Sequence, residues 1–161
     1  MKQIPLMLLL CSVALVCSGQ NDPNAKPNNY AQRLVDEQVA KHPEVVIMAI
    51  HAKSPSDAAY PIIAWFGPTG GKVRVGKKAD EDDMRVITKG TENLEVNEKG
   101  DHFEVELPLQ DMNKQTVGAL AVVYNYKKGD NKAEFKKKAE QIRDDMRPKI
   151  SSADKLNEPG S

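Results

Sequence analysis

The segment Gln110–Asp130, QDMNKQTVGALAVVYNYKKGD, carries the clearest structural pattern in the sequence. A polar run, Gln110 to Thr116, leads through Gly118 into an apolar run from Ala119 to Tyr124, and a charged, glycine-containing turn closes the segment. A short apolar run that is bounded by turn residues is typical of a buried strand. We therefore predict that the last strand of the fold spans Val117–Tyr126.

The segment before it predicts the neighbouring strand. In Phe103–Gln110 the apolar residues alternate with Glu104 and Glu106, which predicts a strand with one buried face and one wet face. Only the polar loop Asp111–Thr116 joins this segment to Val117–Tyr126, so we expect the two strands to be antiparallel neighbours. The turn EKGD, residues 98–101, predicts a hairpin to an earlier strand, NLEVNE.

The remaining segments complete an α+β pattern. Helical spacing of apolar residues predicts a helix near each end, and two apolar runs predict strands after the first helix. Acidic residues after Asp80, followed by Lys89 and Gly90, predict a short helix. The other elements are helix Tyr30–Lys41, strands Glu44–His51 and Tyr60–Gly67, and helix Asn131–Lys149. This order predicts an antiparallel sheet with helices on one side.

The N-terminus predicts export. Lys2 precedes the apolar run Leu6–Val16, and small residues follow, so residues 1–18 have the layout of a secretory signal peptide cleaved after Ser18. The alternative is a lipoprotein signal in which Cys17 is acylated. Either signal would place the mature protein outside the cytoplasm, and cleavage after Ser18 predicts a periplasmic or secreted protein.

The mature chain is expected to form one domain, residues 30–150. Residues 19–29 and 151–161 are polar and predict a disordered linker and a disordered tail. After the signal segment, no apolar stretch is long enough for a membrane span, so we expect a chain that does not cross the membrane.

Composition and motifs disfavour several function classes. Lys and Arg number 23 and Asp and Glu number 23, so there is no basic field to attract nucleic acid. The three histidines, His42, His51 and His102, do not have metal-ligand spacing. The glycine-rich stretch Gly67–Lys72 lacks the pattern of a phosphate loop, and no nucleophile motif occurs. We expect no cofactor, no metal and no enzymatic activity.

Four pieces of the sequence resemble the Cache branch of the PAS-like superfamily, which comprises extracytoplasmic sensing domains of bacteria. They are the leading helix with the strand VVIMAIH, the stretch VGKKADEDDMRVITKG (Val75–Gly90), FEVELPLQD (Phe103–Asp111) and TVGALAVVYNY. The resemblance implies a five-stranded antiparallel sheet with a long N-terminal helix and a C-terminal helix. It also implies that Gly118 permits close backbone approach and that the run after it fills the sheet centre.

The resemblance further implies a small-molecule pocket between the sheet and the connecting loops, with a small carboxylate, an amino acid or a similar metabolite as the ligand. The candidate ligand-binding residues are Trp65, Arg74, Arg85, Tyr124 and Tyr126. Trp65 and Tyr124 would form walls, and Arg74 or Arg85 would hold a carboxylate by paired hydrogen bonds. Family members are often joined to kinase or chemoreceptor parts, so a membrane receptor or a kinase is a possible partner.

Three hypotheses about function follow, and a different structural feature would support each of them. A cavity lined by Trp65 and an arginine would favour a ligand-binding sensor module. A filled sheet face with an exposed apolar patch would favour a structural or protein-interaction module of the same fold. A buried Asp/His pair would favour an enzyme.

Overall fold

The structure is a computed structural model that describes residues 26–68 and 74–160, and these ranges contain three α-helices and five strands. The helices are α1 (Tyr30–Lys41), α2 (Glu81–Lys89) and α3 (Lys132–Met146), with 3₁₀ turns at Arg147–Lys149 and Asp154–Asn157. The strands are β1 (Val45–Ala52), β2 (Ile62–Phe66), β3 (Asn93–Val96), β4 (His102–Gln110) and β5 (Thr116–Asn125). The predicted signal segment, including Cys17, lies outside the described residues.

The strands form one antiparallel sheet in the order β2-β1-β5-β4-β3. β5 is the central strand, where Ala121 faces Ala49 of β1 on one side and Val122 faces Val105 of β4 on the other. The predicted antiparallel pairing of the last two strands is confirmed. The predicted α+β fold with a five-stranded antiparallel sheet is confirmed as well.

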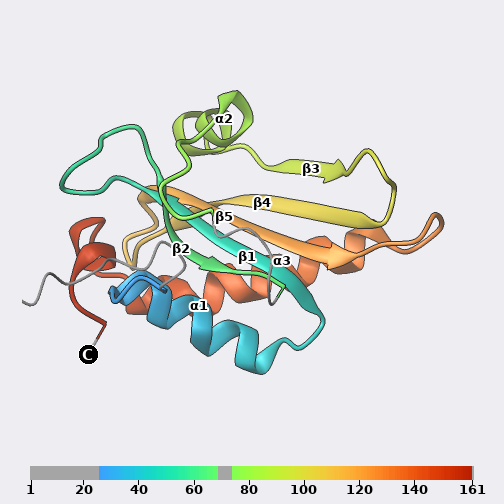
Figure 1. Ribbon diagram of the computed structural model, residues 1–161, viewed down its shortest axis with the longest axis horizontal. Helices are drawn as coiled ribbons and strands as arrows, with labels where there is room; N and C mark the ends of the chain where they lie inside the picture. Colours follow the sequence, from blue (N-terminus) through green and yellow to red (C-terminus); the bar gives the residue numbers. More distant parts are fainter. Residues whose placement is uncertain (1–25, 69–73, 161) are drawn as a thin grey trace, which may run out of the picture.

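The two faces of the sheet differ because side chains alternate along each strand. The first face carries apolar side chains of the main core, among them Met48, Ile50, Val105, Leu107, Leu120 and Val122. The helices α1 and α3 add Leu34, Val35, Ile142 and Met146 to the same core. Figure 1 shows α1 and α3 along this face and α2 over the opposite face. The expectation of helices on one side therefore holds for α1 and α3. α2 departs from it, because Val86 and Ile87 pack on Ala119 of the second face.

Gly118 is the point of closest backbone approach between β5 and β1. A Cβ atom added there would lie 2.1 Å from the carbonyl oxygen of His51, far inside van der Waals contact. Any side chain at position 118 would push the two central strands apart. The glycine in the final strand thus allows the pairing that holds His51 at the second face.

The C-terminal segment differs from the disordered tail that the sequence predicts. Leu156 is fully buried in the main core, and the backbone N–H of Tyr30 donates to the carbonyl of Glu158 at 2.7 Å. Asn29, whose side chain caps α1, also forms a β-bridge with Pro159. One large apolar residue in a polar segment is a weak sequence pattern, but the burial of Leu156, with Ala153 beside it, holds the segment against the main core.

Candidate functional site

A cavity of about 150 Å³ lies between the second face of the sheet and the N-terminal end of α2. Small apolar side chains of the sheet form its floor, including Ala49 of β1 and Ala121 of β5. Its other lining residues are Ile47, His51, Ile62, Trp65, Arg74, Lys77, Asp80, Asp82, Asp83, Asn93, Glu95, Glu104, Glu106 and Val123. The strands β1, β4 and β5 that carry the floor are packed in the main core on their other face.

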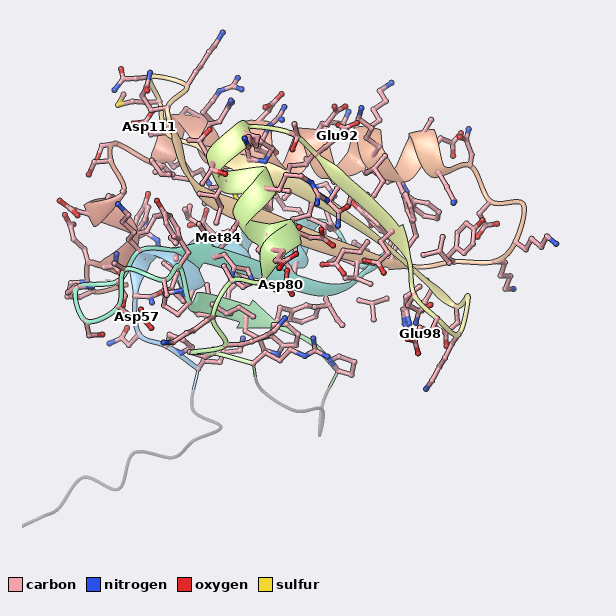
Figure 2. The ribbon with its side chains drawn as sticks, turned by 90° about the horizontal axis from the view of Figure 1, so that it is seen from above. Asp57, Asp80, Met84, Glu92, Glu98 and Asp111 are labelled. Atoms are coloured by element: carbon pink, nitrogen blue, oxygen red, sulfur yellow. The ribbon has the colours of Figure 1, made fainter. Side chains whose placement is uncertain are left out.

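The first turn of α2 places three carboxylates at the cavity. Asp80 is the N-cap: its side chain accepts a hydrogen bond from the backbone N–H of Asp83, and the Asp83 side chain accepts one from the backbone N–H of Asp80 at 2.8 Å. This reciprocal capping box fixes the direction of the Asp83 side chain. Figure 2 shows Asp80 and Met84 on α2 over the middle of the sheet. The acidic first turn that the sequence predicts is therefore part of the cavity wall.

His51 faces the cavity because side chains alternate along β1, so it lies on the same face as Ala49. The pairing of β1 with β2 shifts register beside it, where Ile62 and Ala64 of β2 face His51 and Ile50 and leave Ile63 as the extra residue. The ring Nδ1 lies 2.9 Å from the carbonyl oxygen of Tyr60, which can only accept, so Nδ1 carries a hydrogen. Tyr60 has a positive φ of 52°, a conformation that costs energy for a residue with a side chain.

The other ring nitrogen of His51 faces α2. Its Nε2 lies 3.6 Å from Oδ2 of Asp83, and both residues are buried, at 3% and 9% exposure. The pair joins the sheet to the start of α2 directly above the cavity floor.

Glu106 is the most unusual group of the site. It lies on β4, is 2% exposed, and its Oε1 has no hydrogen-bond partner. Burial raises the pKa of Glu106 to about 9, and a hydrogen bond with Asp83 and the charges of Asp83 and Glu104 add to the effect. At neutral pH Glu106 therefore holds a proton, which it donates to Asp83.

Charge around the cavity is mainly negative. Six lining residues are carboxylates: Asp80, Asp82, Asp83, Glu95, Glu104 and Glu106. Burial raises the pKa of Glu104 too, and the charges of Asp83 and Glu95 raise it further. The basic lining residues are Arg74 and Lys77, which are exposed, and Lys77 already pairs with Asp80 at 3.2 Å.

The structure brings together two of the five predicted ligand residues. Trp65 and Arg74 both line the cavity, with the Arg74 guanidinium 5.9 Å from the centre of the Trp65 ring. Arg85 does not line it, because its guanidinium bonds Asp82 at 2.6 Å and Asn93 at 3.4 Å on the exposed side of α2.

The two predicted tyrosines lie on the opposite face of the sheet. Tyr124 is buried in the main core and stacks on Phe135 of α3 with ring centres 5.0 Å apart. Tyr126 packs against Phe103 at the same face. Neither residue therefore reaches the cavity, and a role of Tyr124 as a cavity wall is excluded by the alternation along β5.

Sequence reasoning missed the residues at the inner end of the cavity, His51, Asp83, Glu104 and Glu106. The alternation of Glu104 and Glu106 with apolar residues was visible, and it correctly placed both on one face of β4. Alternation of polar and apolar residues predicts that the polar face is exposed to solvent. It does not reveal that a helix, α2, covers this face. Asp83 similarly has an ordinary sequence interpretation as a helix-start residue.

Within ranges 26–68 and 74–160, no group of three or more His, Cys, Asp or Glu side chains is arranged to hold a metal ion. None of the helices in these ranges is long and apolar enough to cross a membrane.

No protein-family model and no curated protein matches this sequence. Among solved structures, the fold is similar to the GAF domain of A. aeolicus nlh2 in an inactive state, with a TM-score of 0.52, 10% identity, and coverage of 70% of this chain and 77% of that one. The chain has a PAS/GAF-like fold. The GAF domain region of a Geobacter sulfurreducens PCA protein is also similar, with a TM-score of 0.48, 9% identity, and coverage of 71% and 91%.

GAF domains are relatives of the PAS-like fold, so the PAS-like fold that the resemblance implies is confirmed. The narrower Cache assignment stays a prediction. At such low identity the likeness concerns the fold alone, and the function has to be argued from the cavity.

Proposed function

We propose that this chain is a small-molecule-binding module of the sensor type, that it acts outside the cytoplasm after removal of its signal segment, and that its ligand occupies the cavity beneath α2. The observation that carries the proposal is the cavity itself, a concave space with an apolar floor and a few convergent polar groups. Trp65 and Arg74 line it, which is the arrangement that distinguishes the sensor hypothesis.

The size and charge of the cavity restrict the ligand. A volume of about 150 Å³ suits a molecule of roughly benzene size rather than a nucleotide. The excess of carboxylates disfavours a simple small carboxylate, because its charge would meet Glu104, Asp83 and Glu95. Among the expected ligands an amino acid or a similar amine-bearing metabolite fits better, with Arg74 at the exposed edge available for a carboxylate.

We propose binding without catalysis, although the structure contains the buried Asp/His pair, His51 and Asp83, that would favour an enzyme. His51 Nδ1 is committed to the Tyr60 carbonyl, and Nε2 points to Asp83 rather than to a nucleophile. Among the lining residues within 26–68 and 74–160 there is no serine, threonine or cysteine for the pair to activate. The pair is better explained as a clamp that holds α2 on the sheet.

The alternative is a structural or protein-interaction module without a ligand. It requires a filled sheet face and an exposed apolar patch, whereas the second face contains the cavity. The large exposed apolar residues of the described ranges, Val75, Leu94 and Met112, belong to three separate segments. A sensor module of this kind would pass its signal to a partner, for which a membrane receptor or a kinase is our proposal.

A thermal-shift screen of the mature protein tests ligand binding. The screen contains small carboxylates, amino acids, amines and neutral polar compounds. Ala121→Leu fills the cavity floor, and Ala133→Leu is the matched control, because Ala133 is exposed on α3. We expect compounds that stabilise the wild type and Ala133→Leu but not Ala121→Leu. A screen in which no compound stabilises the wild type, or in which Ala121→Leu responds equally, would contradict the proposal.

A further inference from the structure

We propose that the inner end of the cavity is a binding site for a primary ammonium group, held by Glu106 and Asp83, and that its occupation releases a proton from this carboxylate pair. The inference rests on the proposed function and names the chemical class of its ligand. It begins from Glu106 Oε1, which is buried, lines the cavity and has no hydrogen donor.

An acceptor without a donor is costly inside a protein, so Glu106 marks a place where a ligand can supply the missing hydrogen bond. An ammonium group carries three donors and no acceptor, which suits two neighbouring carboxyl groups. The Trp65 ring also lines the cavity, and the face of an indole attracts cations. A hydroxyl would satisfy one oxygen but would not compensate the charge of the surrounding carboxylates.

The titratable groups around Glu106 come from β1, α2, β3, β4 and the loop before α2, whereas β2 and β5 contribute apolar and aromatic lining residues. The titratable groups are His51 of β1, Asp80, Asp82 and Asp83 of α2, Glu95 of β3, Glu104 of β4, and Arg74 and Lys77 of the preceding loop. The two basic residues are exposed, and Lys77 is drawn to Asp80. The buried end near Glu106 and Asp83 is thus acidic, with His51 as its only neighbouring base among the lining residues that the structure describes.

The proton balance follows from the pairing of Glu106 with Asp83. In the free protein Glu106 holds a proton and donates it in a hydrogen bond to Asp83, because a second buried charge beside that carboxylate would be repelled. An entering R–NH₃⁺ replaces that proton as the positive charge between them. The carboxyl O–H bond of Glu106 breaks, the proton leaves to solvent, and the carboxylate accepts an N–H hydrogen bond from the ligand.

Because binding releases a proton, the affinity should depend on pH in the same way for every amine that binds. As long as the free protein holds the proton and the amine stays charged, affinity should rise by up to about tenfold for each pH unit. This applies between about pH 6 and about pH 8, below the ordinary pKa of an alkyl ammonium group, which is similar to that of lysine.

The test is calorimetric titration of the mature protein with probes that share one skeleton and differ in one group. Ethanolamine carries the ammonium, choline is a cation without N–H donors, ethylene glycol is neutral and glycolate is an anion. Glycine, alanine and 1,4-diaminobutane extend the ammonium series, and they distinguish amino acids from amines. We expect binding within the ammonium series only, with release of about one proton at pH 7 when buffers of different ionisation enthalpy are compared.

Glu106→Gln keeps the shape of the side chain and removes the carboxylate. It should weaken binding of the ammonium probes at least tenfold and abolish the pH dependence, whereas Glu98→Gln should change neither. Glu98 lies in the β3–β4 hairpin, at the edge of the molecule away from Asp80 (Figure 2). If Glu106→Gln does not fold, the same test can be made with Asp83→Asn, which should also weaken binding of the ammonium probes, and with the number of protons that the wild type releases.

Three outcomes would overturn the inference, and they are distinguishable. Binding of glycolate or ethylene glycol, blocked by Ala121→Leu and without any response to the ammonium series, would refute the ammonium site and leave the proposed function intact. The absence of any binding by any probe would refute both. Ammonium binding that releases no proton would refute the role of the Glu106–Asp83 pair.

Discussion

Asp83 of α2 lies 3.6 Å from His51 of β1, and this contact joins the sheet to the helix that covers its second face. A hydrogen bond to the backbone orients each of the two side chains. Asp83 accepts the backbone N–H of Asp80, and His51 donates to the carbonyl of Tyr60. Val86 and Ile87 pack α2 on the second face, and the contact between His51 and Asp83 lies beside this apolar packing at the first turn of the helix.

The first prediction concerns the pH dependence of stability. The pKa of Glu106 rises from 4.5 to about 9 in the folded protein, so the stability contributed by its proton is complete below about pH 4.5 and is lost as pH rises toward 9. From about pH 5 to about pH 8, the free energy of unfolding should fall relative to that of Glu106→Gln by up to about 1.4 kcal/mol per pH unit. Urea denaturation of both proteins across this range measures it. Glu98→Gln should follow the wild type, and parallel curves for wild type and Glu106→Gln would contradict the prediction.

The second prediction concerns the cap of α2. Asp80→Ala removes the side chain that accepts the N–H of Asp83, and loss of an N-cap costs about 1 kcal/mol. Amide hydrogen exchange should accelerate in α2 while the exchange in β5 changes only with global stability. Asp82→Ala is the control, because Asp82 lies in the same turn and makes only an exposed ion pair with Arg85. Equal losses in the two variants would show that the cap is unimportant.

The third prediction concerns the junction of the two central strands. Gly118→Ala places a Cβ atom 2.1 Å from the carbonyl oxygen of His51, so β1 and β5 have to separate. We expect a loss of about 3 kcal/mol or more in the free energy of unfolding, at the upper end of overpacking effects. Ala119→Gly makes the opposite exchange at the next residue and should cost about 1 kcal/mol. A Gly118→Ala protein as stable as the wild type would refute the close approach.

The fourth prediction uses Trp65, the one tryptophan of the chain. Its indole lies against Gly67, where an added Cβ atom would be 2.9 Å from the ring. Gly67→Ala should therefore move the indole, shift its fluorescence emission and weaken ligand binding, with little loss of stability because Trp65 is only half-buried. Unchanged emission would show that the ring does not occupy this position.

The sequence predicts the elements of this fold well because their patterns are local. The acidic first turn and Gly90 delimit α2, and the alternation in Phe103–Gln110 predicts β4. The site is harder to predict because it depends on which face α2 covers. Alternation assigns Glu106 to a face but does not distinguish solvent from a cavity. For the same reason the sequence does not exclude Tyr124 from the pocket, whereas the structure places its side chain in the core that α1 and α3 cover.

The most direct test of the account is a fluorescence titration of Trp65 in the wild type and in Ala121→Leu, with the same ethanolamine, glycine and glycolate probes. Trp65 and Ala121 both line the cavity, so an occupant must contact or displace the indole. We predict a saturable change in emission with ethanolamine or glycine, no change with glycolate, and no change with any probe in Ala121→Leu. An emission that does not respond to any of the probes in the wild type, or that responds equally in Ala121→Leu, would contradict a ligand site beneath α2.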